Sequence, residues 1–311
     1  MSEQKLEVFN VLKYLEEGHE IEDVLKEDQF GTFSSAEECI EYLIGEEYLE
    51  GDVSVTVDVE ITAEAISKKY IVSELKEILR ENGLKVSGKK QELVERVLPI
   101  LKEAKDASNL NVGVDKEKSY ADLKLTDKAH EFLKENDWID LYLFALAAFR
   151  FEDYETYVNG SSADKIETGL NFCDEIISRA LVANHFLVFL DALTAKAHVY
   201  AYDENYDSFM DYDLQRYILG LNPIVMDSQT YATYEVINES NIVNLRNVVK
   251  TLKIADLKKR FDKIWNMSKI HSITVPKKIC YKILQKAIDG ADIEELNFDV
   301  RQRYFDKKFG I

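Results

Sequence analysis

Glycine and proline are scarce in this chain, and their scarcity limits the possible fold classes. Only 12 glycines and 3 prolines occur among the 311 residues, whereas β-sandwiches and dinucleotide-binding α/β folds use many of both in turns and phosphate loops. Hydrophobic residues make up 46% of the chain and charged residues 31%, which is enough apolar surface to offset the entropy of ordering the chain. We therefore predict a mainly α-helical globular protein of about two domains.

Cysteine is also rare, and long apolar runs are missing. Cys39, Cys173 and Cys280 form no Cys-x-x-Cys motif and no even-numbered framework, which favours a reducing compartment. The first residues mix acidic with apolar side chains and lack the basic and apolar regions of a signal peptide. The longest apolar stretches, around 141–149 and 186–190, are shorter than the roughly 18 residues of a membrane span. We expect a cytoplasmic protein without membrane contact.

The familiar motifs of enzymes and metal sites are missing as well. The five histidines never fall in a His-Glu-x-x-His pattern, and the chain holds neither a phosphate-binding P-loop nor a Gly-x-Ser-x-Gly motif. The acidic run 203–211 begins like a calcium loop, but Ser208 and Leu214 stand where that loop needs Gly and Glu, so we predict an acidic hairpin. We expect no catalysis, cofactor or metal, although carboxylates brought together from distant positions could still form a nuclease site.

Negative charge dominates the chain but is unevenly distributed. The net charge is −19, to which residues 1–130 contribute −13, residues 131–245 contribute −14 and residues 246–311 contribute +8. The basic segment 246–311 could be a binding surface for an acidic partner or an intramolecular counterweight to the acidic middle. The sequence leaves both interpretations open.

Three short helices and a strand are predicted at the N-terminus. Apolar residues recur with helical spacing over 6–15 and 21–25, and Ser34-Ser35 can cap a third helix that runs to about Leu49. Strict alternation over 53–61 then predicts a half-buried strand. This order resembles a winged helix-turn-helix domain over residues 5–66, so we assign 1–69 to a winged-helix-like unit with a small β hairpin. The third helix is acidic, which favours protein contacts over DNA reading.

Residues 70–104 carry the most specific pattern. Two short apolar stripes predict two packed helices, the first with Leu75, Ile78 and Leu79 and the second with Leu93, Val94, Val97 and Leu101. Asn82-Gly83 predicts the end of the first helix, and Leu84 can fold back onto its stripe. The segment resembles a SAP module, the helix-loop-helix unit of DNA-associated proteins. The matching residues are Glu74-Leu75-Lys76, Leu79, Gly83-Leu84, Ser87-Gly88-Lys89-Lys90, Leu93-Val94 and Arg96.

A phosphate site is predicted where the second helix of this segment begins. Ser87 stands where an N-cap is wanted, and Lys89 and Lys90 follow on the first turn, with Lys85 just before. Free backbone N–H groups and the helix dipole favour an anion there. Together with the SAP resemblance, this predicts nucleic-acid binding by Lys85, Ser87, Gly88, Lys89 and Lys90, with Arg80 and Arg96 as second-rank candidates. The contacts would be weak, salt-dependent and sequence-tolerant.

The rest of the chain is predicted to be a linker and a helical domain. Residues 105–120 are rich in turn formers and charge and predict a linker or exposed hairpin. Residues 59–66 and 123–130 resemble each other, and their strands could pair across the SAP module, so we assign 105–135 to a linker with a returning strand and helix. Helical patterns fill 136–311, notably 166–190, 192–202, 245–265, 276–288 and 292–305.

Our leading interpretation is a non-enzymatic protein that binds double-stranded DNA weakly through the SAP module. The helical domain would contact a protein partner or a second copy of the chain. We expect a bacterial or phage source, because the arrangement resembles SAP proteins of such genomes. The alternative is an assembly protein in which the SAP fold is a scaffold and DNA is not the ligand.

Overall fold

The computed structural model describes residues 2–26, 30–58, 63–104, 115–222, 237, 239–251, 257–268 and 274–310. The chain is mainly α-helical, as predicted. It divides into two compact units: an N-terminal unit of Asn10–Leu133, and a helical unit that joins Met1–Phe9 to Lys134–Ile311. Each unit is described below by itself.

The N-terminal unit begins with three helices, α1 (Ser2–Glu16), α2 (Ile21–Val24) and α3 (Ala36–Gly45). The Ser35 side chain accepts from the Glu38 N–H at the start of α3, which confirms the predicted cap. The prediction that α3 reaches Leu49 is wrong. Glu47 takes a left-handed φ of 61°, and the Tyr48 N–H donates to Leu43 O, so the helix closes at Gly45 and the chain turns into a strand.

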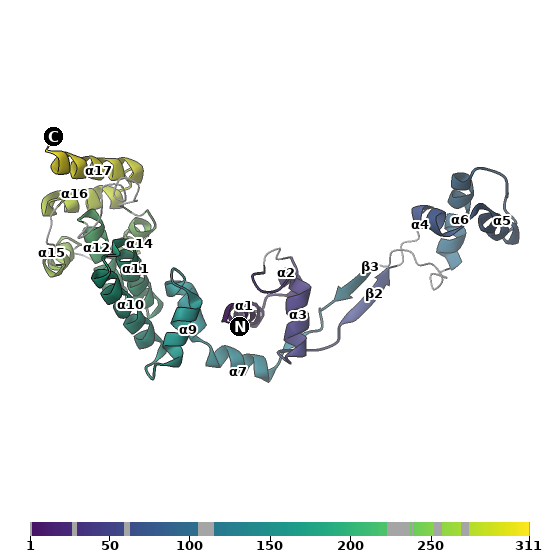
Figure 1. The fold of residues 1–311 in the computed structure, drawn as a ribbon, viewed down its shortest axis with the longest axis horizontal. Helices are drawn as coiled ribbons and strands as arrows, with labels where there is room; N and C mark the ends of the chain where they lie inside the picture. The colour runs from purple at the N-terminus through teal and green to yellow at the C-terminus, as the bar shows by residue number, and fades with distance from the viewer. Residues whose placement is uncertain are drawn as a thin grey trace. The chain divides into compact units, whose positions relative to one another are not determined.

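Two antiparallel pairs of strands follow the helices. Strand β1 (Leu49–Glu50) pairs with β4 (Lys124–Leu125), and β2 (Ser54–Asp58) pairs with β3 (Asp115–Ser119). Figure 1 shows β2 and β3 side by side. Strands before and after the SAP segment therefore pair, as the repeat suggested, but the partners differ from the prediction. Residues 124–125 pair with 49–50, and β3 forms within the stretch predicted as a linker or exposed hairpin.

The burial predicted for the strand at 53–61 is not seen where its side chains are described. Val53, on the face predicted to be buried, is 36% exposed, whereas Ser54 is exposed as expected for the polar face. Residues 59–61 and the side chains of 55–58 lie outside the described set. Burial of the apolar side chains at 55–61 therefore stays a prediction.

Three more helices precede β3, namely α4 (Ala63–Lys69), α5 (Val72–Glu81) and α6 (Lys90–Ala104). After β4 the chain continues into α7 (Asp127–Glu135). Thr126 begins α7 as predicted: its Oγ1 accepts from the Ala129 N–H and donates to the carbonyl of Glu47. This hydroxyl links the returning helix to the turn between α3 and β1.

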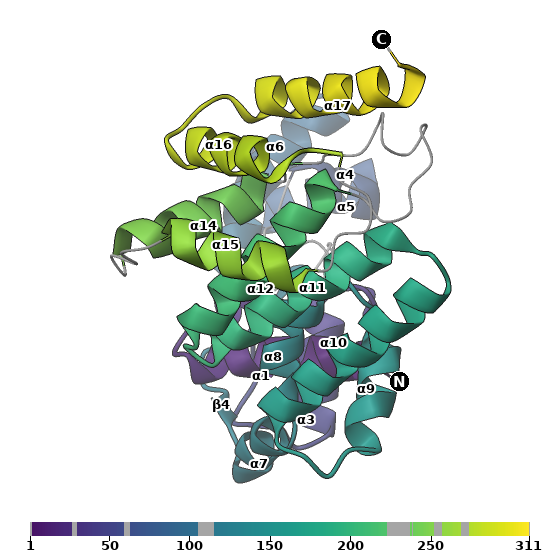
Figure 2. The ribbon, with the colours of Figure 1, turned by 90° about the vertical axis from the view of Figure 1, so that its left-hand side faces the viewer.

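The helical unit consists of α-helices and one π-helical turn. Its elements are α8 (Trp138–Leu141), η2 (Tyr142–Leu146), α9 (Phe151–Asn159), α10 (Lys165–Val182), α11 (Phe186–Tyr202), α12 (Tyr206–Leu221), α14 (Glu239–Thr251), α15 (Leu257–Met267), α16 (Lys277–Ile288) and α17 (Ile293–Phe309). Helices α10, α11 and α12 pack in sequence order, and Figure 2 shows α16 between α14 and α17.

One of the predicted helices is divided in the structure. The segment 166–190 forms α10 and the start of α11, because Asn184 adopts a left-handed φ of 56° and the His185 N–H donates to Ala180 O. The segment 245–265 belongs to α14 and α15, with residues 252–256 outside the described set. An apolar pattern that continues across a short turn hides that turn from the sequence.

Buried apolar residues form a large cluster where α12, α14, α15, α16 and α17 meet, with Leu214, Tyr217, Phe261 and Leu284 among its members. A smaller cluster lies between α10 and α11 and includes Phe186 and Leu193. Helix α12 is enclosed by its neighbours, since none of residues 211–222 is exposed.

Candidate nucleic-acid interface

A small apolar core holds the segment predicted as a SAP module together. Its fully or nearly fully buried residues are Ile66, Leu75, Leu79, Leu93, Val94 and Val97. Both predicted stripes therefore face this core. Ile66 comes from α4, a helix that begins before the predicted segment 70–104 and packs on α6. The module consequently has three helices, and the predicted bounds 70–104 leave out α4.

Helix α5 ends as the sequence predicts, but the residue after its glycine behaves differently. The Glu74 carboxylate accepts from the Ile71 N–H at the start of the helix. Gly83 has a φ of 69°, and the Leu84 N–H donates to Leu79 O, which closes the helix. The Leu84 side chain is 44% exposed, so the prediction that it folds back onto the stripe is wrong. Val86 packs against the core instead.

An arginine of α6 holds the loop between α5 and α6 in place. Arg96 donates from Nη1 to the carbonyl of Lys85 and from Nη2 to the carbonyl of Ser87, the latter at 2.9 Å, and its Nη2 lies 3.6 Å from the Glu92 carboxylate. One planar guanidinium thus binds two carbonyl groups of the same loop. Arg96, a second-rank candidate for phosphate contact, has its donors directed at the chain itself.

Gly88 gives this loop its path into α6. Its φ of 142° lies in a region that side-chain-bearing residues rarely adopt. A Cβ built there would lie 2.4 Å from the Glu92 carboxylate and 2.8 Å from Arg96 Nη2. The glycine therefore makes room for the ion pair that holds the loop.

The candidate lysines surround the start of α6. Helix α6 begins at Lys90, and the carbonyl of Lys89 accepts from the Leu93 N–H, so Lys89 occupies the cap position that Ser87 was expected to fill. Ser87 instead offers its carbonyl to Arg96. Lys85 and Lys89 are exposed and Lys90 is half-buried. Within the part of the chain that the structure describes, none of these three side chains forms an ion pair or hydrogen bond.

These cations favour an anion because none of them has an ion-pair partner among the described residues; Glu92, in the same first turn of α6, pairs with Arg96 instead. A lysine at a helix N-terminus opposes the helix dipole, and the first backbone N–H groups of α6 have no partner within the helix. Arg80, on α5, is likewise exposed and unpaired among the described residues. The structure thus separates the candidates into free cations (Lys85, Lys89, Lys90 and Arg80) and residues that shape the loop (Ser87, Gly88 and Arg96).

Residues 67–102 match the SAP domain family model. The SAP module predicted from the sequence is confirmed. SAP domains are generally DNA-binding modules, which suggests that this chain associates with DNA. Searches of curated proteins and of solved structures found no match to the chain.

Other kinds of site find little support in the described residues. Across them, no three His, Cys, Asp or Glu side chains come together as a metal site. None of the described helices has both the length and the apolar character to cross a membrane. Only residues 203–205 of the acidic run form the turn between α11 and α12, and residues 206–211 belong to α12, which Asn205 caps. The prediction of an acidic hairpin at 203–211 is therefore wrong. The three cysteines are buried, and burial raises the pKa of Cys173 to about 12, so its thiol is unreactive.

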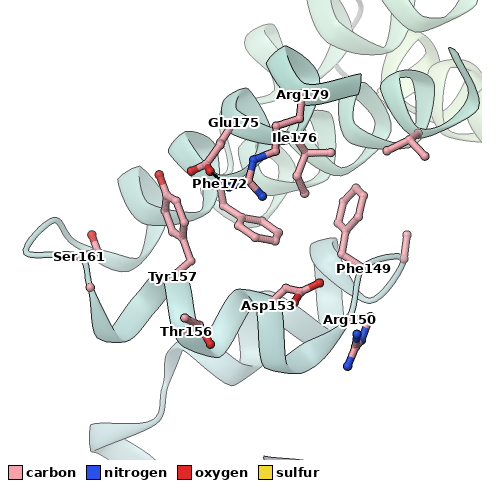
Figure 3. Close-up of a pocket in the computed structure, with 13 residues that line it drawn as sticks. Phe149, Arg150, Asp153, Thr156, Tyr157, Ser161, Phe172, Glu175, Ile176 and Arg179 are labelled. Atoms are coloured by element: carbon pink, nitrogen blue, oxygen red, sulfur yellow. Dashed lines mark hydrogen bonds and ion pairs between the residues drawn. The ribbon is translucent and has the colours of Figure 1, made fainter. Parts of the chain in front are cut away.

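The helical unit carries an open groove between α9 and α10. Its volume is about 930 Å³. Figure 3 shows the labelled groove residues on both helices, on the loop before α9 and on the loop between α9 and α10, namely Phe149, Arg150, Asp153, Thr156, Tyr157, Ser161, Phe172, Glu175, Ile176 and Arg179. Arg179 pairs with Glu175 within α10, and Arg150 pairs with Glu152. The groove thus combines aromatic walls with charges that are already paired, and its lining contains no histidine or cysteine.

An exposed apolar patch adjoins the groove at the turn between α10 and α11. Val182 is 87% exposed, Leu181 46%, and Leu187 and Val188 39% each. Val188 also lines the groove. Residues 180–190 contain no charged side chain, so the patch is an uncharged area on a strongly acidic chain. Contiguous exposed apolar residues commonly mark contact surfaces.

Proposed function

We propose that this chain is a non-enzymatic DNA-binding protein whose SAP module contacts the phosphate backbone through Lys85, Lys89 and Lys90. The observation that carries the proposal is the set of three unpaired lysines around the start of α6, in a segment that matches the SAP family. Lysine side chains and helix N-termini contact phosphates without reading bases. The loop lacks the arginine or asparagine fork that would select a base, because its arginine is engaged with carbonyls.

The salt dependence of binding gives the size of the expected effect. Each neutralised phosphate contributes about −0.9 to the slope of log affinity against log salt, so three lysines contribute about −2.7. Between about 50 and 200 mM salt this alone corresponds to a loss of about 40-fold in affinity. Binding through one module is therefore weak at physiological salt.

Fluorescence anisotropy of a labelled duplex tests this proposal. Lys89→Ala/Lys90→Ala should make the salt slope less steep by about 1.8. The matched control is Lys124→Ala/Lys134→Ala, which removes two lysines that are exposed and unpaired among the described residues. A folded wild-type protein that fails to bind duplex at low salt, or equal slopes for the two double variants, would contradict the proposal.

The exposed patch supports a second candidate function, assembly through the helical unit. We propose that Leu181, Val182, Leu187 and Val188 bind the same patch on a second copy of the chain. An uncharged patch can face its own copy without bringing like charges together, although the chain as a whole carries −19. A dimer would also carry two SAP modules, which raises occupancy on DNA through effective concentration. Under the alternative assembly role, this contact would be the principal function.

Light scattering after size exclusion tests the contact. Val182→Glu/Leu187→Glu should convert a dimer to a monomer, whereas Val243→Glu, which alters another exposed apolar residue, should leave the dimer intact. A wild-type protein that stays monomeric over the accessible concentrations would refute self-association through the patch. The DNA proposal would be unaffected, because it rests on the separate SAP lysines.

A further inference from the structure

The basic side chains of segment 246–311 have different roles in the structure. Arg246 donates to the carbonyls of Ala287 and Ile288 and so caps the end of α16. Arg260 pairs with Asp207 and with Asp211, the latter at 3.2 Å. These residues hold the helical unit together. For Arg260, whose partners belong to the acidic middle of the chain, the counterweight interpretation of the basic segment is correct.

Further cations of this segment are also engaged. Lys263 lies 2.9 Å from Asp211, and Lys277 lies 2.9 Å from Asp262. Lys258 pairs with the same Asp262. Their charges are thus directed at acidic groups of the same unit. They are not available to a partner without breaking these pairs.

Three lysines of α16 remain, and they lie on one face. Lys278, Lys282 and Lys286 are exposed and follow one another at a spacing of four residues, and we call them the α16 lysine stripe. Within the described part of the chain they form no ion pair or hydrogen bond. The opposite face of α16 is buried, with Cys280 and Leu284 fully enclosed. The stripe is therefore held on a rigid helix and faces away from the core.

The stripe carries an electrostatic cost that nothing on α16 relieves. Helix α16 contains no acidic residue. Like charges four residues apart destabilise a helix by roughly 0.2–0.5 kcal/mol per pair. This arrangement stands out in a chain with 58 acidic and 39 basic residues, where other basic side chains of the same segment, namely Lys258, Arg260, Lys263 and Lys277, each have an acidic partner. A polyanion placed along the stripe would remove the repulsion.

We propose that the α16 lysine stripe is a second phosphate-backbone contact for duplex DNA. The stripe is about 12 Å long, from eight residues at about 1.5 Å each, and one DNA strand advances about 3.4 Å per phosphate. It therefore matches about three phosphates of a strand. Among the exposed residues of this face is Gln285, and no exposed aromatic or aliphatic side chain lies between the lysines. Protein interfaces are depleted in lysine and enriched in aromatic residues, so the composition favours DNA over an acidic protein.

This inference rests on the proposed function in one respect: it takes the SAP module as the first DNA contact, to which the stripe adds a second. Two weak contacts in one chain act together because binding of one raises the effective concentration of the other. Their salt slopes add, since each lysine that meets a phosphate releases counterions. The stripe thus converts a weak single-module interaction into one with useful occupancy.

Salt-dependent anisotropy with the full-length protein tests the stripe. Lys282→Gln/Lys286→Gln should make the slope on duplex less steep by about 1.8. Lys124→Gln/Lys134→Gln removes the same charge from exposed lysines elsewhere and should leave the slope unchanged. Circular dichroism melting of both variants checks that the fold is retained. Equal slopes for the stripe variant and the control would overturn the proposal.

Combining variants separates this proposal from that for the SAP lysines. If Lys89→Ala/Lys90→Ala has no effect but the stripe variant flattens the slope, the stripe stands and the SAP site fails. If only the SAP variant has an effect, the stripe proposal fails and the SAP site stands. Poly-glutamate as a second probe identifies the other class of partner: stripe-dependent binding of this polypeptide without stripe-dependent duplex binding would overturn the DNA assignment.

Discussion

Arg96 allows a sharp test of how the SAP loop is built. Its guanidinium donates to the carbonyls of Lys85 and Ser87 and pairs with Glu92. Arg96→Lys keeps the positive charge but replaces a planar fork with a single ammonium, which cannot serve both carbonyls in the same geometry. We expect this substitution to loosen the loop while the module stays folded.

The magnitude follows from the two hydrogen bonds. A hydrogen bond with a charged partner contributes about 1.5–3 kcal/mol. The Arg96 side chain is 29% exposed, so water replaces part of both bonds when they break, and we take about 1.5 kcal/mol for the pair. That free energy corresponds to about a tenfold change in the equilibrium for opening the loop.

Hydrogen exchange of the full-length protein measures this opening. The amides of residues 84–89 should exchange about tenfold faster in Arg96→Lys. Arg80→Lys is the matched control, because Arg80 is exposed and unpaired among the described residues. DNA affinity should fall with Arg96→Lys because Lys85 and Lys89 lose their fixed positions, whereas the salt slope should be retained because no charge is removed.

A direct phosphate contact by Arg96 predicts the opposite pattern. Arg96→Gln would then make the salt slope less steep by about 1 while loop exchange stayed at the wild-type rate. That result would refute the assignment of Arg96 as a positioning residue. It would return Arg96 to the group of phosphate ligands.

Three further predictions concern the backbone, a buried carboxyl group and the counterweight pairs. Gly88→Ala should destabilise the SAP module by about 1–3 kcal/mol in a thermal melt, because its φ of 142° strains any other residue. Burial raises the pKa of Asp213 to about 7, so its protonated form stabilises the fold at low pH and this stability is lost as the pH rises from about 4 through 7; Asp213→Asn should abolish the corresponding drop in melting temperature. Arg260→Gln should cost about 1 kcal/mol at low salt and less at high salt, since it breaks the ion pairs with Asp207 and Asp211.

Local signals predicted the SAP module well because they act over a few residues. The two apolar stripes, the glycine that ends α5 and the capping serine of α3 each depend on side chains within one or two helical turns. Such preferences can be read from one sequence without knowledge of the fold. The same holds for Asn159-Gly160-Ser161-Ser162, whose turn-forming residues indicate a turn between two helices and which lie between α9 and α10 in the structure.

The predictions failed where the structure depends on a residue far away in the sequence, or where two nearby residues could fill the same place. Leu84 was expected to cover the core, but Val86 takes that place, and both are apolar residues in the same loop. Strand 124–125 pairs with 49–50, a partner that the sequence did not indicate, because strand partners depend on register set across the intervening 70 or so residues. Asn184 breaks a helix whose apolar pattern continues on both sides.

The role of each cation was the hardest feature to predict. Arg96 and Lys89 stand seven residues apart and both belong to the SAP pattern, yet one is directed at carbonyls and the other at solvent. The difference depends on Gly88, whose missing side chain leaves space for the Arg96 guanidinium. The sequence gives the number of charged side chains. Whether a cation is free to contact a phosphate depends on the partners that the fold brings within its reach.

The proposed DNA binding has to overcome the acidity of the chain. A net charge of −19 repels a duplex at long range, but at physiological salt the Debye length is about 8 Å, so charges farther away than this are largely screened. Binding then depends on the few lysines that reach phosphates, and each lysine paired within the fold is removed from that number. Because the SAP lysines and the α16 lysine stripe both lack partners among the described residues, they can act at contact distance. The acidic residues of the rest of the chain disfavour DNA contacts that do not involve these lysines.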